Sequence, residues 1–391
     1  MAEAFIVSGV RTPIGALSGS LADVPAAELG AICIREALAR ANSVGEEVDE
    51  VLMGNVVGAG QGQNPARQAT IRAGLPASVG ATTLNKVCGS GLKSVMLAAQ
   101  AVRVGDANLV VAGGMESMSR APYLLPQARQ GYRLGNGELL DSVVHDGLWD
   151  VYGNKHMGTY GDQCAAQSGL SRQDQDDFAV RSYTRAQKAQ ADGVFASEIV
   201  PVKVVVKRAE TVVNQDEGPS RFNEEKLRAL RPAFGGEGTV TAGNASSIND
   251  GGAAVVVASE SLCKSKSLAP RARIVGMATH SREPEWFTLA PIGAIEKLLA
   301  KTGWSVDDTD LFEINEAFAA VTLAAERALH IPSEKVNVYG GAVSLGHPIG
   351  CSGTRILVTL LNALERKEGR RGIAALCIGG GEGVAMAVER V

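Results

Sequence analysis

Two short blocks of this chain recur about 260 residues further along, and the repeat constrains the fold more than any other feature of the sequence. Glu50-Val-Leu-Met-Gly-Asn55 is matched by Asp310-Leu-Phe-Glu-Ile-Asn315 at an offset of 260 residues. Cys88-Gly-Ser-Gly91 is matched by Gly350-Cys-Ser-Gly353 at an offset of 262 residues. Because the two matches occur in the same order at nearly the same offset, the sequence predicts two related halves produced by an internal duplication.

The local pattern within the halves is that of an α/β fold. Short runs rich in β-branched residues alternate with amphipathic stretches at helical spacing, which is the rhythm of βαβ units. In the first half we expect strands over residues 4–7, 51–55, 82–87 and 109–112, and helices over residues 26–41, 65–73 and 89–104. The 46 glycines fit an architecture with many tight turns between strands and helices.

A long segment separates the two halves. The chain has 391 residues, and because a domain usually has ~100–200 residues, two or three domains are expected. We predict a first half over residues 1–117, completed by residues 250–270, an inserted loop domain over 118–249, and a second half over 271–391. The insertion is rich in Pro, Gly and charge, with one polar helix over 171–191. Residues 249–252, Asn-Asp-Gly-Gly, have the composition of a turn before a strand over 253–258. An insertion of this size on a rigid scaffold typically covers a ligand.

Composition excludes several classes of function. The net charge is −4 with both signs interspersed and no basic tract, so nucleic acid is not an expected partner. No apolar stretch reaches the ~18 residues of a membrane span. The six cysteines, at positions 33, 88, 164, 263, 351 and 377, form no CxxC pair, which argues against a metal site and a disulfide framework. We therefore expect a protein of the reducing cytoplasm in which some thiols are reactive.

The first block that carries chemistry is Lys86-Val-Cys-Gly-Ser-Gly91. A strand is expected to deliver Cys88 to a tight glycine-rich turn that opens a helix. Helix N-termini stabilise anions, so this position favours a thiolate, and the glycines let a substrate carbonyl approach the backbone N–H groups. The pattern indicates a nucleophile, and a small residue in a packed turn is the alternative.

Three further blocks place reactive or polar side chains at turns. His347 stands between Gly346 and Pro348 just ahead of a helix start, where it is suited to a cleft and to taking a proton from a cysteine; a capping histidine is the alternative. Cys377 ends a strand at a glycine-rich turn, and buried packing is its alternative role. Asn315 lies between a strand and a helix, where it could cap the helix, hold a water or polarise a carbonyl.

Four blocks in this order are similar to those of the thiolase family: Cys-Gly-Ser-Gly at 88–91, Asn-Glu-Ala-Phe at 315–318, Gly-His-Pro-x-Gly-x-Ser-Gly at 346–353 and Cys-x-Gly-Gly-Gly at 377–381. The likeness runs from Val7-Ser-Gly-Val-Arg-Thr-Pro13 to the end of the chain and includes Val110-Val-Ala-Gly-Gly-Met-Glu-Ser-Met118. It implies a five-layered α-β-α-β-α fold of two duplicated halves with an inserted loop domain, which agrees with the duplication inferred from the repeats.

The resemblance also implies a ping-pong mechanism in which Cys88 takes the acyl group and His347 activates it. Cys377 then removes a proton from the α-carbon of acetyl-CoA in synthesis, or protonates the departing carbanion in cleavage. His347 and a water held by Asn315 would form one oxyanion hole, and the backbone N–H groups of Cys88 and Gly379 another. The resemblance implies that this chemistry needs no metal and no nicotinamide. Coenzyme A thioesters are its substrates and not cofactors.

By the same resemblance, the insertion helps to bind coenzyme A. Six residues correspond to its expected contacts: Leu148, His156, Met157, Arg221, Ser246 and Phe318. The first three resemble the wall around the pantetheine arm, Ser246 the serine that contacts a pantetheine amide, and Phe318 the apolar lining. Arg221 is placed where it would reach the adenine end.

Features of the insertion resemble the short-chain acetoacetyl-CoA thiolases. They are the pair His156-Met157 and the segment 127–137 with Arg129 and Arg133, which builds a tetramer in that subgroup. The expected reaction is therefore condensation of two acetyl-CoA to acetoacetyl-CoA and CoA, or the reverse thiolysis, by a homotetramer. Departures at Trp286-Phe-Thr-Leu-Ala-Pro291 and Cys351 leave an alternative, a 3-ketoacyl-CoA thiolase of broader or longer chain specificity acting in fatty-acid β-oxidation.

Two other functions fit the fold that the resemblance implies. A condensing ketoacyl synthase would use two histidines, or a histidine and an asparagine, and would lack the terminal acid–base thiol, so Cys377 argues against it. A non-catalytic lipid carrier would be expected to lose Cys88 or His347, and the chain keeps both.

Overall fold

The computed structural model describes residues 2–206 and 208–391. Its first half alternates strands and helices up to the insertion and regains one strand after it: β1 (Ala4–Arg11), α1 (Ala26–Arg40), β3 (Glu50–Gly54), α2 (Pro65–Arg72), β4 (Gly80–Leu84), α3 (Ser90–Val104), β5 (Leu109–Ser117) and β12 (Asn249–Ser259). The second half repeats this series: β13 (Ala272–Ser281), α8 (Ala290–Thr302), β14 (Leu311–Ile314), α9 (Ala319–Leu329), α11 (Ile349–Arg366), β15 (Arg371–Ile378) and β16 (Glu382–Arg390).

Both halves arrange equivalent strands in the same order. Across the sheet the first half reads β4-β3-β5-β12-β1 and the second β14-β15-β16-β13. A parallel bridge between Phe312 and Val336 lies beside β14, where the first half has β4. In each half the first two central strands are parallel, β3 to β5 and β14 to β15, whereas the next strand runs antiparallel. The predicted duplication is therefore confirmed in the topology.

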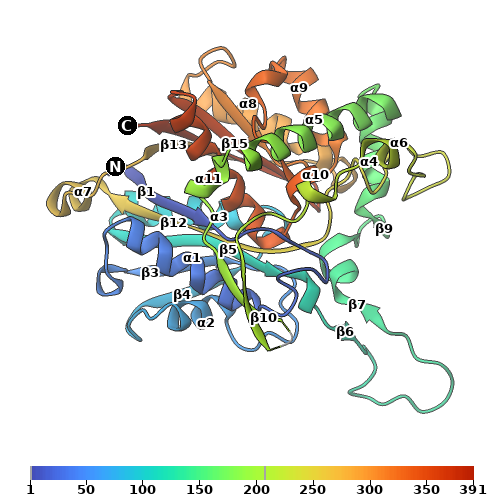
Figure 1. The fold of residues 1–391 in the computed structure, drawn as a ribbon, viewed down its shortest axis with the longest axis horizontal. Helices are drawn as coiled ribbons and strands as arrows, with labels where there is room; N and C mark the ends of the chain where they lie inside the picture. The colour runs from blue at the N-terminus through green and yellow to red at the C-terminus, as the bar shows by residue number, and fades with distance from the viewer. Residues whose placement is uncertain (1, 207) are drawn as a thin grey trace.

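The helices divide into a central layer and two outer layers (Figure 1). Apolar residues of α3 and α11 form one core with the facing sides of both half-sheets. The cores on the opposite faces contain α1 and α2 on the first half and α8 and α9 on the second. The half-sheets meet where β1 pairs with β13 through Phe5–Arg273 and Ile6–Ala272. The result is the five-layered α-β-α-β-α arrangement expected from the sequence.

The insertion contains more regular structure than the single helix that the sequence predicts. Its elements are β6 (Tyr123–Leu124), β7 (Leu140–Asp141), β8 (Trp149–Asp150), β9 (Lys155–His156), α4 (Met157–Gln167), α5 (Arg172–Ala191), β10 (Val202–Val206), β11 (Ala209–Val213) and α6 (Glu224–Arg228). In Figure 1, α4, α5 and α6 lie beside the second half, while the loop between β6 and β7 extends away from the body of the molecule. None of the helices over the described residues is long and apolar enough to cross a lipid bilayer.

The prediction of a turn at residues 249–252 is wrong. These residues are the first four of β12, and they pair with β5 and with β2 (Gly15–Ala16). Asn, Asp and Gly are typical of turns, but here the glycines serve close packing: a Cβ on Gly252 would stand 2.8 Å from the backbone oxygen of Leu29 in α1. Tertiary contact therefore decides the conformation, and local composition does not.

Candidate active site

A cavity of about 500 Å³ lies between the two halves and the insertion. Nine of the residues singled out from the sequence line it: Cys88, Leu148, His156, Met157, Arg221, Ser246, Phe318, His347 and Gly379. The other two, Asn315 and Cys377, are fully buried outside the lining. Cys377 belongs to the apolar cluster that contains Phe318, and Asn315 lies two residues before Ala317, which lines the cavity. The structure thus gathers all the predicted residues in one region.

The turn before α3 holds Cys88 in a constrained position. Val87 adopts a φ of 45°, which is a strained conformation for a β-branched residue. The Ser90 hydroxyl fixes the turn, because it accepts the N–H of Lys86 at 2.8 Å and donates to the Val87 carbonyl at 2.6 Å. The Lys86 ammonium also pairs with the Glu382 carboxylate of the second half at 2.7 Å. These contacts tie the turn that carries Cys88 to the glycine-rich turn after β15.

The protonation state of Cys88 differs from the sequence-based expectation. The start of a helix was expected to favour a thiolate, but burial raises the pKa of the Cys88 thiol to about 11. Backbone N–H groups of Gly379 and of Cys88 itself act in the opposite direction and lower that pKa without overcoming burial. Cys88 is therefore a thiol near neutral pH, and formation of its thiolate would require a base.

His347 has the properties of that base. Its Nδ1 lies 2.6 Å from the Ser352 hydroxyl, which donates its proton to the Pro348 carbonyl at 2.9 Å. Because a hydroxyl has one proton to donate, Nδ1 of His347 carries the ring proton and Nε2 is the free lone pair. This Nε2 has no hydrogen-bond partner among the described residues. Burial, followed by the charge of Arg355, lowers the pKa of the imidazole to about 3, so the ring is neutral.

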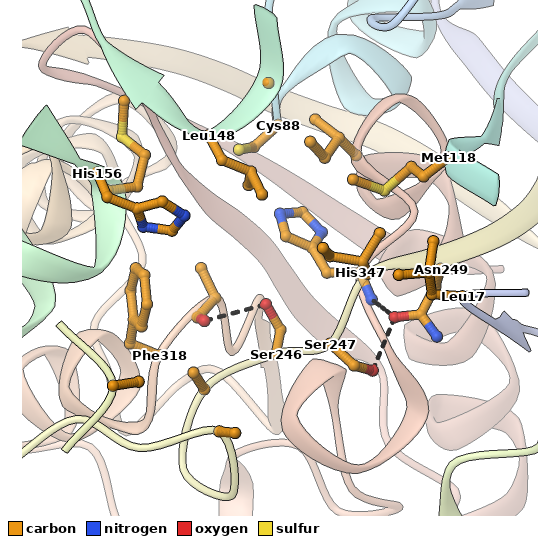
Figure 2. Close-up of a pocket in the computed structure, with 18 of the residues that line it drawn as sticks. Leu17, Cys88, Met118, Leu148, His156, Ser246, Ser247, Asn249, Phe318 and His347 are labelled. Carbon is orange, nitrogen blue, oxygen red and sulfur yellow. Dashed lines mark hydrogen bonds between the residues drawn. The ribbon is translucent and has the colours of Figure 1, made fainter. Parts of the chain in front are cut away.

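The backbone of His347 is fixed by a residue that the sequence analysis assigned to a turn. The Asn249 Oδ1 accepts the N–H of His347 at 2.9 Å, and the Asn249 Nδ2 donates to the Gly15 carbonyl at 2.9 Å. Figure 2 shows Asn249 beside the backbone of His347, with the imidazole ring and Cys88 facing the same hollow. A lone Asn in turn-like composition gave no sign of this role.

The second thiol and the strand-end amide are buried next to the cavity. Cys377 lies at the end of β15, and burial raises its pKa well above the ordinary value, with Cys88 and Cys164 adding to the rise. The thiol is therefore protonated and able to deliver a proton. Asn315 follows β14 and is fully buried, yet neither its side-chain oxygen nor its nitrogen has a partner among the described residues. An unpaired buried amide is costly and fits a site for water or a ligand.

The insertion supplies one wall of the cavity. The His156 ring stacks on Phe234 with 4.7 Å between ring centroids, and Phe234 in turn meets Phe318 edge to face. The Nδ1 of His156 accepts the Gly158 N–H at 3.1 Å and so caps α4. Phe234 was not predicted as a site residue, since it stands in a Gly- and Pro-rich segment without regular periodicity. Arg221 remains largely exposed at the rim, where it pairs with Glu217.

Comparison with known proteins agrees with this geometry. Sequence models of the thiolase N-terminal and C-terminal domains match residues 4–261 and 268–390. The chain is 50% identical over its whole length to the whole acetyl-CoA acetyltransferase of Cupriavidus necator, and 51% identical to that of Escherichia coli, again with both chains fully covered. The crystal structure of the Bacillus anthracis acetyl-CoA acetyltransferase matches with a TM-score of 0.98 at 44% identity, covering 100% of this chain and 99% of that one. The chain therefore belongs to the thiolase family.

Proposed function

We propose that this protein condenses two acetyl-CoA molecules to acetoacetyl-CoA and CoA, or catalyses the reverse thiolysis, through an acetyl group carried on Cys88. The observation that carries the proposal is the arrangement of Cys88 and the free Nε2 of His347 around one cavity, with the Cys377 thiol buried beside it. The alternative of a condensing ketoacyl synthase has no use for that second thiol.

The groups account for every proton in the thiolysis direction. Cys88 attacks the ketone carbon of acetoacetyl-CoA while His347 takes its proton, and the carbon–carbon bond breaks. Cys377 gives its proton to the departing carbanion, which leaves as acetyl-CoA. A CoA thiol then attacks acetyl-Cys88 and passes its proton to the Cys377 thiolate. The Cys88 thiolate leaves and recovers its proton from His347, and condensation is the reverse of these steps.

Two groups of donors would stabilise the negative oxygens. The protonated Nε2 of His347 and a water held by Asn315 face the enolate oxygen, and the N–H groups of Cys88 and Gly379 face the tetrahedral intermediate. The N–H of Gly379 already acts on the Cys88 sulfur, since it lowers the pKa of that thiol. We expect the reaction to need neither a metal ion nor a nicotinamide.

Coenzyme A would enter along the wall formed by the insertion. Leu148, Met157 and Phe318 offer apolar contact to the pantetheine arm, and Arg221 at the rim is free to turn toward a phosphate. At the inner end, Phe287 is buried in the cluster that contains Cys377. Phe287 also lines the cavity, and we expect its bulk to favour acetyl-CoA over longer 3-ketoacyl substrates.

Alkylation and chain-length assays test the proposal. Iodoacetamide should label Cys88, since the other five cysteines are buried, and acetyl-CoA should protect it. Thiolysis measured across 3-ketoacyl-CoA lengths should be fastest for acetoacetyl-CoA. A maximum at a longer chain would favour the β-oxidation enzyme, and equal labelling with and without acetyl-CoA would contradict an acetyl-Cys88 intermediate.

We also propose that the protein is a cytoplasmic homotetramer. The projecting loop between β6 and β7 exposes apolar side chains whose contact with water is unfavourable. Their exposed fractions are 53% for Leu125, 39% for Tyr132, 100% for Leu134 and 58% for Leu139. Light scattering should give four times the chain mass at micromolar protein. A stable dimer would rule out this assembly.

A further inference from the structure

The duplication gives the catalytic site a counterpart on the other side of the central helices. In the first half Gly54 pairs with Gly114, and in the second half Ile314 pairs with Ala375. One residue beyond Gly54 and Ile314 stand Asn55 and Asn315. Glu116 stands two residues beyond Gly114, and Cys377 stands two residues beyond Ala375. Glu116 faces Gly350 at one helix start, and Cys377 faces Cys88 at another. The sequence repeat aligns Gly350 with Cys88. We call Asn55, Glu116 and Gly350 the counterpart site.

Glu116 closes the counterpart site with four hydrogen bonds. It is fully buried. Its Oε1 accepts the Asn55 side-chain N–H at 2.7 Å and the Val57 N–H at 3.2 Å. Its Oε2 accepts the Val56 N–H at 3.0 Å and the Gly350 N–H at 2.8 Å. Three of the donors belong to the loop after β3, and the fourth belongs to the second half. Glu116 therefore joins the halves at one carboxylate.

The carboxylate contact is supported by close packing at Gly350. The Gly350 carbonyl lies against two glycines of the first half, because a Cβ on Gly54 would stand 2.9 Å from that oxygen and a Cβ on Gly114 would overlap it. Gly350 itself has no room for a side chain, since a Cβ there would stand 2.7 Å from Glu116. The start of α11 is thus seated on the ends of β3 and β5, and Glu116 fixes it there.

The same helix start carries His347. The turn from His347 to Gly350 has two anchors on other elements: Asn249 on the His347 N–H, and Glu116 on the Gly350 N–H. Resting on the proposed function, in which His347 activates Cys88, we propose that Glu116 is a positioning residue that holds the His347 turn against the first half. The alignment of His347 with Cys88 then depends on a residue that does not line the cavity.

A carboxylate suits this position because four N–H groups converge on it. Both oxygens of an ionised carboxylate only accept, so all four bonds can form at once. A glutamine of the same shape would turn an NH₂ group toward N–H donors of Asn55 or Gly350. Glu116→Gln should therefore loosen one side of the contact without changing the volume.

The test compares Glu116→Gln with the same change at a control carboxylate, Glu198, which binds the same helix, α11, at another place. Glu198 is also buried and binds Thr359 and Asn362, in the middle of α11 and far along it from His347. For Glu116→Gln at pH 8, above the pKa of about 7 that burial gives Glu116, we expect kcat and the rate of Cys88 alkylation to fall together by about 10- to 100-fold, as small misalignments do. The KM for acetyl-CoA should stay within about twofold, because the cavity wall is intact. Glu198→Gln should lower the melting temperature but leave alkylation unchanged.

A rescue variant sharpens the test. Adding Asn55→Asp to Glu116→Gln gives the new NH₂ group an acceptor and frees the glutamine oxygen for Gly350, so alkylation should recover in part. Recovery should not be complete, because the Val57 N–H still faces the NH₂ group and the Met115 carbonyl loses the donor that Asn55 supplies. If Glu116→Gln does not fold, Glu116→Asp keeps the charge with a shorter reach and should lose about threefold or more in alkylation. Normal alkylation and kcat in the folded variant, with only a lower melting temperature, would overturn the proposal. Unchanged alkylation in His347→Ala would instead overturn the proposed function.

Discussion

The catalytic site and the counterpart site occupy equivalent places in the two halves, yet they differ in how far their polar groups are hydrogen-bonded. In the counterpart site the Asn55 amide N–H is bonded to a carboxylate that also binds three backbone N–H groups, although the Asn55 Oδ1 has no partner among the described residues. In the catalytic site Asn315 leaves both side-chain polar atoms unpaired among the described residues. The position is thus closed by hydrogen bonds in the first half, and in the second half it is left open for water or a ligand.

The residues at the two facing helix starts, Gly350 and Cys88, differ in the same way. Gly350 offers only a backbone N–H to its own site, whereas Cys88 offers a thiol. Burial raises the pKa of the Glu116 carboxyl to about 7, although three backbone N–H groups lower it. Burial likewise raises the pKa of Cys377. Glu116 and Cys377 are both fully buried, so the difference between the two sites follows from the side chains placed there.

The largest expected effect comes from removing the proposed nucleophile, Cys88. Cys88→Ala should lower condensation and thiolysis by about 10⁴-fold or more, because no acyl group can be held. The melting temperature should change little, since the substitution removes one sulfur atom at the edge of a cavity. Mass spectrometry should find no acetyl group after incubation with acetyl-CoA, and a stable acetyl adduct on this variant would show that another residue is the nucleophile.

The corresponding change in the counterpart site should lower stability and, because Gly350 belongs to the His347 turn, slow acetylation without moving the acetyl group from Cys88. In Gly350→Ala the new methyl group would stand 2.7 Å from Glu116 and 3.0 Å from Asn55. Overpacking of this kind costs typically about 1–3 kcal/mol. The free energy of unfolding should therefore fall, which urea titration would measure, while any acetyl group stays on Cys88.

Cys377→Ser should separate acetylation from carbon–carbon bond formation. The serine keeps the shape, but its hydroxyl is a far weaker acid than a thiol. Proton transfer to carbon should slow condensation by about 10²- to 10⁴-fold. The variant should still acetylate Cys88, detectable as a mass increase on the peptide that contains it. Near-normal condensation, or loss of acetylation, would mean that the two thiols do not divide the work in this way.

The two asparagines should respond differently to truncation. Asn315→Ala removes an amide with no partner, so the free energy of unfolding should be nearly unchanged while kcat falls by about 10²-fold. Asn55→Ala removes a donor from buried Glu116 and should cost about 1–3 kcal/mol of stability. Urea unfolding and thiolysis assays on both variants would check this contrast. Equal stability losses would show that Asn315 is a structural residue like Asn55.

The sequence predicted the duplicated fold and grouped the site residues, but it could not reveal how buried contacts change their chemistry. The repeats at Cys88 and Gly350 fixed the relation between the halves. The pKa of Cys88 was misjudged because a helix start is visible in a sequence and burial is not. The block containing Glu116 was recognised only as part of a family motif, since three of its donors lie 59 to 61 residues away and the fourth lies 234 residues away.

The smallest expected effect is a pH dependence of stability that originates in Glu116. Its pKa is raised from 4.5 to about 7 on folding, so between these values the native state binds more protons than the unfolded chain. The stabilising contribution is present at low pH and is lost as pH rises through about 7. Glutamine does not titrate, so the free energy of unfolding of the wild type minus that of Glu116→Gln should fall between pH 6 and pH 8, by on the order of 1 kcal/mol.

Urea titrations of both proteins at pH 6, 7 and 8 would measure this difference. Other raised carboxyls, such as Glu313 with a pKa of about 8, are present in both proteins and cancel in the subtraction. A difference that grows as pH rises would mean that Glu116 is ionised at pH 6 and that its four donors outweigh burial. The counterpart site would then be an ionised clamp at every pH at which the enzyme works, and the contrast with the protonated thiol of Cys377 would be sharper still.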